Sequence, residues 1–203
     1  MITNDIFYVD KTAFIKEWWE NHDAVTLITR PRRFGKSMAA DMLVAYYSKG
    51  CDSAELFNGR EAKKAEDFAI HLNRHNVIRL DIQRFLETER DLTTFIADIE
   101  FKVIMELKAE FSQCKNIEID GKLKTALDQI FFQTGNGFLF IIDEWDCVFR
   151  LARNHEKTQR EYLDFLRGLF KGAEYVEPAY MTGILPIKKY GDHSAINIFK
   201  PGL

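Results

Sequence analysis

Residues 25–37 read VTLITRPRRFGKS, and this stretch decides the expected fold. Val25–Thr29 is apolar and rich in β-branched side chains, so we expect a buried strand there. Residues 36–48 contain neither glycine nor proline and are expected to form a helix. Between the two, the tripeptide Gly35–Ser37 matches the end of the phosphate-binding loop pattern GxxxxGK[ST], in the strand–loop–helix setting that the pattern requires.

The chemistry of such a loop assigns a task to each residue type. Backbone N–H groups at the start of the helix point at an anion, and the helix dipole favours negative charge there. We expect Lys36 to reach the terminal phosphates and the Ser37 hydroxyl to ligate Mg²⁺. Gly35 is expected to let the backbone approach the phosphates without a Cβ in the way. The residues expected to contact the nucleotide are Arg30, Arg32, Arg33, Phe34, Gly35, Lys36 and Ser37.

The arginines of this loop are its unusual feature. Arg30 stands where the pattern has its first glycine, and together with the rigid Pro31 it implies a reshaped loop. Four cations fall within residues 30–36. Like charges this close repel one another unless an anion sits among them, which again indicates a polyphosphate ligand.

A second candidate site follows another apolar run. Residues 139–144 read LFIIDE, four apolar residues ending in two carboxylates. We expect Asp143, at the tip of a buried strand, to help hold Mg²⁺, directly or through water. Glu144 is then placed to orient or deprotonate an attacking water. The alternative is an acidic pair that only stabilises a helix N-terminus.

The remaining pattern predicts an α/β fold. Apolar strands that alternate with helices indicate a parallel sheet with helices on both faces, whose ligands bind beyond the carboxyl ends of the strands. Residues 50–75 are expected to be mostly helical. Further strands are expected at 76–81, 138–142 and 179–184, and further helices at 13–19, 91–111, 122–134 and 158–171.

Composition narrows the class of protein. The 203 residues are 46% hydrophobic and 29% charged, which fits one globular domain over residues 1–203. Residues 51–149 carry 19 acidic against 12 basic side chains, so a broad nucleic-acid surface is not expected. We expect no membrane partner, because no apolar run approaches about 20 residues. Three widely spaced cysteines predict reduced thiols and a cytoplasmic protein. His71 and His75 are expected to be a solvated pair.

Four stretches, in order along the chain, resemble the bacterial AAA-ATPase-like family. The resemblance implies a three-layer P-loop NTPase with a mostly parallel central sheet flanked by helices, and ATP and Mg²⁺ as ligands. It implies further that Lys36 and Glu144 are catalytic and that Ser37 and Asp143 contact the metal. The stretches are YVDKT at 8–12, TRPRRFGKS at 29–37, IDEWD at 142–146 and TGI at 182–184.

The resemblance also suggests roles for residues outside the loop. Thr182 would sense the γ-phosphate, although a threonine that satisfies a strand-end turn at Gly183 is an equal alternative. The turn Asp10–Thr12 would lie near the adenine. Some arginines would complete the site of a neighbouring subunit. The candidates for that role are Arg150, Arg153, Arg160 and Arg167.

These patterns predict a slow, Mg-dependent ATPase that drives or switches an unknown protein partner or a second copy of itself. Members of the resembled family often carry a nuclease-like domain after the ATPase, and AAA-type ATPases carry a lid. We expect the lid to be absent or truncated here, with nucleic acid involved only through such a further domain. The alternatives are a weakly catalytic nucleotide switch or interaction module and, with less support, a kinase.

Overall fold

A computed structural model describes residues 9–21, 24–88, 92–118, 121–185 and 200–201. Its centre is a sheet with the strand order β2-β3-β4-β1-β5, in which every pair is parallel. The predicted parallel sheet is therefore confirmed, and the two-residue β5 extends it beside β1. The strands are β1 (Val25–Thr29), β2 (Asn76–Asp81), β3 (Phe138–Asp143), β4 (Val176–Gly183) and β5 (Lys200–Pro201).

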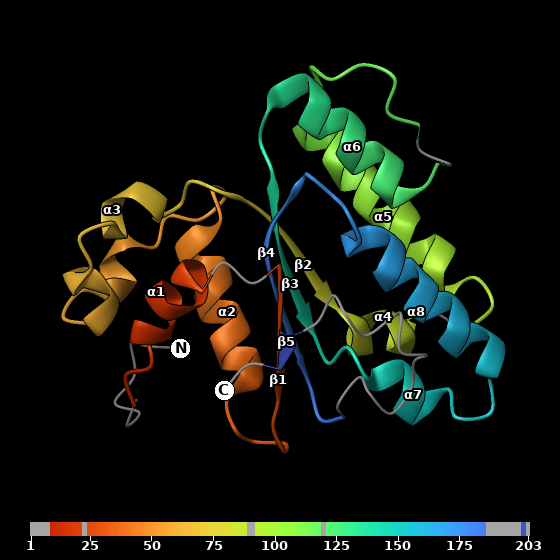
Figure 1. Cartoon of the computed structure of the whole chain (residues 1–203), viewed down its shortest axis with the longest axis horizontal. Coiled ribbons are helices and arrows are strands. Elements are labelled where there is room, and N and C mark those ends of the chain that lie inside the picture. Colours follow the sequence, from red (N-terminus) through yellow and green to blue (C-terminus); the bar gives the residue numbers. More distant parts are fainter. Residues whose placement is uncertain (1–8, 22–23, 89–91, 119–120, 186–199, 202–203) are drawn as a thin grey trace.

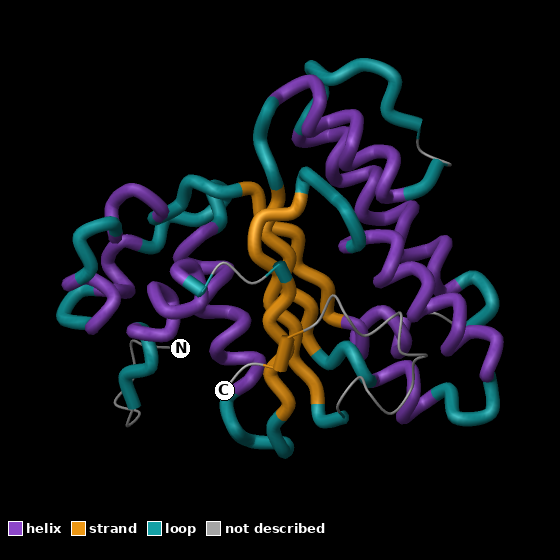
Figure 2. Tube along the Cα trace, in the orientation of Figure 1, coloured by secondary structure: helices purple, strands orange, loops and turns teal. Residues whose placement is uncertain are grey.

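Helices cover both faces of the sheet, as expected for strands that are apolar on both sides (Figures 1 and 2). One face carries α1 (Ala13–Glu20), α2 (Lys36–Tyr47), α3 (Phe68–His71) and the short 3₁₀ helices η1 (Ala54–Phe57) and η2 (Glu61–Lys64). The other face carries α4 (Ile82–Thr88), α5 (Phe95–Glu110), α6 (Leu123–Thr134), α7 (Cys147–Leu151) and α8 (Glu156–Phe170).

The inner strand β3 contributes side chains to both hydrophobic cores. All six of its residues are buried, and successive side chains point to opposite faces. Leu139 and Ile141 pack in the core under α1 and α2. Phe140 and Ile142 pack in the core under α5, α6 and α8. Both layers of helices thus pack against β3, and this packing fixes the position of Asp143, the last residue of the strand.

Proline makes one irregularity in the sheet. Pro178 lies inside β4, between β3 and β1, although it has no N–H to donate to a neighbouring strand. The register between β3 and β4 shifts at this point, where Phe138 pairs with Val176 but Phe140 pairs with Ala179. The strand therefore begins three residues earlier than the sequence pattern indicates, and a bulge accommodates the proline.

Three predictions about helices need correction. Residues 50–75 are largely turns and 3₁₀ helix, because Gly50, Gly59 and short polar runs offer no long apolar face. The helices α4 and α7 were not expected, since each begins within four residues of the end of a strand and is too short to show a period of 3.6 residues. Both of these helices face the site described below.

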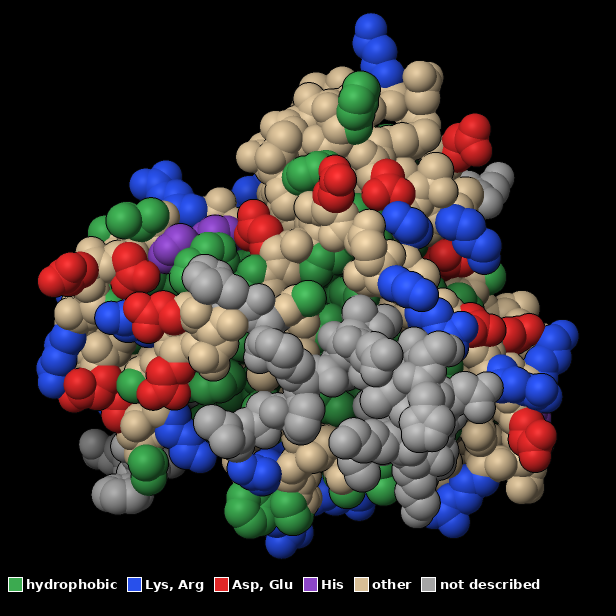
Figure 3. Space-filling view, in the orientation of Figure 1, with side chains coloured by type: hydrophobic (Ala, Val, Ile, Leu, Met, Phe, Trp, Pro, Cys, Tyr) green, Lys and Arg blue, Asp and Glu red, His purple; other side chains and the backbone are tan. Residues whose placement is uncertain are grey.

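The surface and the thiols have ordinary properties. Acidic and basic side chains are interspersed over both helical layers in the view of Figure 3. Cys51, Cys114 and Cys147 are free thiols. Among the residues that the structure describes, every helix is too short or too polar to span a lipid bilayer.

Candidate functional site

The carboxyl ends of four strands meet at one edge of the sheet. Asp81 at the end of β2 pairs with Asp143 at the end of β3, and Thr29 of β1 pairs with Gly183 of β4. The loop that follows β1 therefore lies beside the polar residues that end β3 and β4. This is the edge at which parallel α/β sheets bind ligands.

The loop enters α2 through a glycine with a left-handed backbone. Gly35 is the N-cap of α2 with φ 75°, and its carbonyl accepts the N–H of Ala39 at 2.9 Å. A Cβ at this position would meet no atom within 4 Å. The backbone angle by itself therefore favours glycine here, and the expected close approach of the backbone to the phosphates stays a prediction.

An open cleft of about 500 Å³ lies in front of this helix start. Lys36 is only 7% exposed, and its Nζ donates to the carbonyl of Pro31 at 3.1 Å, so its ammonium lies under the loop. Two elements on the far side, α4 and the end of β3, complete the wall. The lining residues are Arg32, Arg33, Gly35, Lys36, Ser37, Met38, Gln83 and Glu144.

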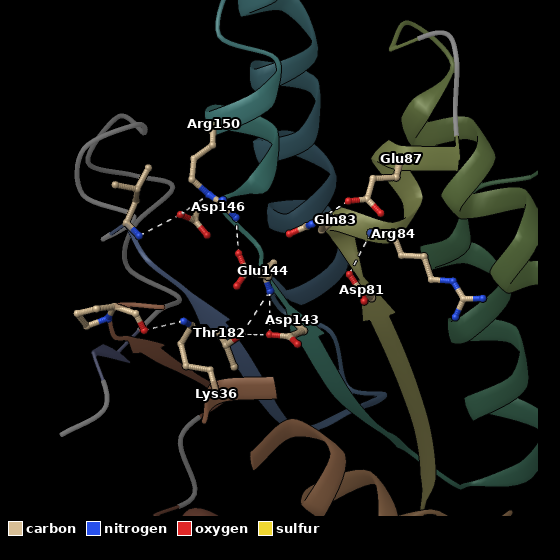
Figure 4. A network of polar contacts seen from close by, with 12 residues as sticks. Lys36, Asp81, Gln83, Arg84, Glu87, Asp143, Glu144, Asp146, Arg150 and Thr182 are labelled. Carbon is tan, nitrogen blue, oxygen red and sulfur yellow. Dashed lines mark hydrogen bonds and ion pairs between the residues drawn. The ribbon is translucent and has the colours of Figure 1, made fainter. Parts of the chain in front are cut away.

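Two residues predicted for the site lie just behind the cleft. Asp143 is 3% exposed, and its Oδ1 accepts hydrogen bonds from the Thr182 hydroxyl and from the Glu144 N–H at 3.1 Å (Figure 4). Its Oδ2 makes no hydrogen bond to any residue that the structure describes. Thr182 is fully buried, and the partner of its hydroxyl is the Asp143 carboxylate. Its predicted contact with a phosphate stays a prediction.

Arg30 is also set apart from the cleft. Its backbone N–H donates to the carbonyl of Gly183 at 3.2 Å and so extends the pairing of β1 with β4. Its guanidinium donates to the carbonyl of Thr29 at 3.3 Å and is exposed. The loop thus brings Arg32 and Arg33 to the cleft while Arg30 fixes the loop to the sheet.

Glu144 is held both by its backbone and by its side chain. Its φ of 53° is left-handed, a backbone conformation that residues other than glycine, asparagine and aspartate rarely adopt. Its N–H also lies 3.3 Å from the Thr182 hydroxyl. Its Oε2 accepts a hydrogen bond from Arg150 of α7. The predicted catalytic carboxylate therefore lines the cleft in an ion pair.

The segment after Glu144 packs closely against the end of β4. A Cβ on Gly183 would lie 2.5 Å from the Trp145 ring and 2.7 Å from Asp146 Oδ1. Real Cβ atoms do not come this close, so only glycine fits. This explains the glycine of the TGI stretch as a packing requirement.

A second hollow, of about 360 Å³, lies on the other side of Gly35. Its walls are apolar apart from two cations, and Phe34 and Met38 are more than half exposed beside it. The predicted turn at Asp10–Thr12 contributes one of those cations. The lining residues are Val9, Lys11, Arg33, Phe34, Gly35, Met38, Ala39 and Met42.

The turn that carries Lys11 is itself well fixed. Asp10 accepts hydrogen bonds from the Thr12 N–H at 2.9 Å, from the Thr12 hydroxyl at 2.7 Å and from the Glu61 N–H at 3.0 Å. Burial raises the pKa of Asp10, but these hydrogen bonds outweigh it and leave the pKa below its usual value. The turn thereby joins the N-terminal segment to η2.

Sequence reasoning missed Gln83 and the in-chain role of Arg150. Gln83 follows the carboxyl end of β2 by two residues, so its place beyond a predicted strand end was a usable signal. Arg150 lies six residues after Glu144 and was considered only as a residue for a neighbouring subunit. Arg153 and Arg160 are exposed, and Arg167 pairs with Asp164 at 3.0 Å.

The fold and the cleft together define a class of protein. A parallel sheet, a Gly-Lys-Ser loop that opens α2 and carboxylates at the end of the β3 strand form a P-loop NTPase-like core. The chain belongs to the AAA-ATPase-like family: the model of that family, described as "Predicted AAA-ATPase", matches residues 1–191. The resemblance noted in the sequence is therefore confirmed, and the family implies nucleotide binding.

A curated relative carries the likeness over nearly the whole chain. It is a protein of Azotobacter chroococcum mcd 1 described as "Uncharacterized protein in vnfD 5'region", and it is 26% identical over 199 residues. The match covers 96% of this chain but 37% of the relative. The chain thus spans little more than a third of the length of that relative.

Proposed function

We propose that this protein binds ATP with Mg²⁺ in the cleft before α2 and hydrolyses it slowly, to drive or switch a protein partner. The observation that carries the proposal is that Gly35, Lys36 and Ser37 line the same cleft as Glu144, although more than a hundred residues separate them. A phosphate anchor and a carboxylate able to act on water are the two parts that phosphoanhydride hydrolysis needs.

The residues of the cleft divide the work between binding and reaction. The N–H groups at the start of α2 and the Lys36 ammonium would hold the β- and γ-phosphates, with Arg32 and Arg33 compensating further charge. Glu144 would orient a water for attack on the γ-phosphorus and take up its proton. Thr182 keeps Asp143 oriented.

The oxygen atoms present suit a magnesium ion. Within the described residues, no group of three or more histidine, cysteine or acidic side chains is placed to hold a metal. Mg²⁺ bound with a nucleotide needs fewer protein ligands, because phosphates and waters supply the rest. The Ser37 hydroxyl and Asp143 Oδ2 would hold it, and when bound it would neutralise charge on the phosphates.

The hollow lined by Val9, Phe34 and Met38 is the place that we propose for the nucleobase. It adjoins the cleft, with which it shares Arg33, Gly35 and Met38. Apolar walls suit the faces of a purine ring, and Lys11 also lines the hollow. This arrangement keeps the predicted link between the Asp10–Thr12 turn and the adenine.

The binding part of the proposal is tested by calorimetry. Lys36→Ala should weaken ATP binding by at least about tenfold, because a charge-assisted contact to phosphate is lost. Lys64→Ala, which removes an exposed lysine on η2, is the matched control and should bind as the wild type does. Equal affinities for wild type and Lys36→Ala, or no binding by the wild type, would refute the proposal.

The catalytic part is tested by separating binding from turnover. Glu144→Gln should keep ATP affinity and lose turnover by about a hundredfold or more, since an amide cannot accept the proton of water. Glu106→Gln, an exposed change on α5, is the control. ATP binding with no turnover at any wild-type concentration would instead identify a non-hydrolysing nucleotide switch.

A further inference from the structure

Arg150 makes an ion pair with Glu144 inside the same chain. Both side chains are largely buried, with 15% of Arg150 and 18% of Glu144 exposed. The Arg150 Nη2 donates to Glu144 Oε2, and its Nε lies 3.3 Å from Asp146 Oδ2 (Figure 4). One guanidinium therefore lies between two carboxylates and is not free to reach a neighbouring subunit.

The position of Arg150 is fixed from behind by Asp146. Asp146 is fully buried, and its Oδ2 accepts the backbone N–H of Leu185 at 3.1 Å. It precedes Arg150 by four residues at the start of α7, so the two side chains lie on one face of the helix. The guanidinium is thereby oriented by a carboxylate that is itself anchored to the segment after β4.

Arg150 also compensates the negative charge of the carboxylates around it. Asp143, Glu144 and Asp146 place three carboxylates within four residues, and Arg150 is the cation that bridges two of them. Without it, the Glu144 side chain would face like charge and would rotate away from Asp146. The pairing occupies Oε2, while Oε1 makes no hydrogen bond to any residue in the described part of the chain.

We propose that Arg150 is a positioning residue for hydrolysis: it holds the Glu144 carboxylate at the cleft with Oε1 free for the attacking water. This inference rests on the proposed function. It predicts that Arg150 acts in its own chain, through Glu144, and contributes to turnover without contributing to nucleotide affinity. An arginine that instead contacted the phosphates bound to a neighbouring subunit would contribute to ATP affinity, and its contribution to turnover would depend on protein concentration.

The test uses two substitutions of one residue. Arg150→Met removes the charge but keeps an apolar stem, and Arg150→Lys keeps the charge but loses the planar fork. Arg150→Met should lower kcat by roughly 10- to 100-fold, the cost of a misplaced catalytic group, with the Kd for ATP unchanged within about twofold. Arg150→Lys should recover part of kcat, and Arg74→Met, which changes an exposed arginine just before β2, is the control.

A double substitution shows whether Arg150 acts through Glu144. In the Glu144→Gln background, Arg150→Met should cause no further loss of turnover, because the carboxylate that it positions is gone. Melting temperatures of the same four proteins, measured without nucleotide, should also be non-additive. If Arg150→Met does not fold, Arg150→Lys carries the comparison.

The outcomes separate this inference from the proposed function. A wild-type protein without ATP turnover overturns both. Wild-type turnover that Arg150→Met leaves unchanged, or increases, overturns the positioning role alone, and an increase would identify Arg150 as a restraint. A weakened Kd, or an equal loss in the Glu144→Gln background, shows that Arg150 acts on the nucleotide and not on Glu144.

Discussion

At the scale of single residues, backbone strain gathers at the cleft. Four non-glycine residues in the described part of the chain have positive φ, and two of them are asparagines, which tolerate it. The other two are Arg33 at 68° and Glu144 at 53°, and both line the cleft. Such strain persists where surrounding contacts impose it, and it marks functional positions.

A pair of substitutions measures the strain at Glu144. Glu144→Gly should be more stable than Glu144→Ala by about 1 kcal/mol, because only glycine adopts this φ without penalty. At Glu106, in the middle of α5, the order should be reversed, and alanine should be more stable by about 1 kcal/mol. The free energies of unfolding in urea give both differences. Alanine being the more stable residue at both positions would show that Glu144 is unstrained.

At the scale of elements, sequence reasoning found the strands β1 to β4 and missed the two-residue β5 and two short helices. β1 and β3 were predictable because Val25–Thr29 and Phe138–Ile142 are apolar runs bounded by polar turns. Gln83 on α4, and the role of Arg150 on α7 within its own chain, were missed because those helices have only seven and five residues. The pairing of Arg150 with Glu144 depends on the turn of the backbone after β3, and no spacing rule encodes that turn.

The loop after β1 carries a testable charge effect. Arg32 and Arg33 are exposed at the cleft beside Lys36 and repel one another without an anion. Arg32→Gln/Arg33→Gln should therefore raise the melting temperature of the free protein slightly. It should also remove much of the saturable increase that ATP, or inorganic phosphate at higher concentration, gives the wild type.

Thermal melts over a ligand series make the comparison. The control replaces two exposed cations at the two ends of α8, Lys157 and Lys171, with glutamine and should leave the ligand-induced shift as in the wild type. If the loop variant shows the same ATP-dependent shift as the wild type, its arginines face solvent or a partner, and phosphate is held by the backbone and Lys36 alone.

At the scale of the whole molecule, a histidine pair joins elements at the end of the sheet remote from the cleft. His71 Nδ1 lies 3.0 Å from His75 Nε2, and His75 Nδ1 lies 2.9 Å from Glu177 at the start of β4. The Trp19 ring packs against both imidazoles. The side chains of His71 and His75 are 17% and 13% exposed, so the expected solvated pair is wrong.

This pair predicts a loss of stability in mild acid. Burial lowers the pKa of His71, and the neighbouring His75 lowers it further, against the opposite effects of Asp67 and Glu177. Below about pH 6.5 the unfolded chain binds a proton that the folded protein resists, so stability falls as the pH decreases toward the folded pKa. His71→Gln should flatten the fall in melting temperature between pH 7 and 5.

His155→Gln, which changes an exposed histidine, should leave the pH dependence of the wild type in place. An equally steep fall in His71→Gln would assign the acid sensitivity to other groups. Asp10 affects stability in a lower pH range. Because its pKa is lowered in the folded protein, its contribution to the free energy of unfolding is lost only below about pH 4. The two contributions are therefore separable in one set of melts.

The end of β4 links the two sides of the cleft over a very short path. The Gly183 carbonyl accepts the N–H of Arg30, where the loop between β1 and α2 begins, and the Thr182 carbonyl accepts the N–H of Trp145, next to Glu144. One peptide unit separates these two attachment points. The loop and the segment that carries the Glu144 carboxylate are thus both attached to two neighbouring residues of the same strand. We therefore expect a displacement that a ligand imposes on the loop to move the Glu144 carboxylate as well, since close-packed interiors transmit strain.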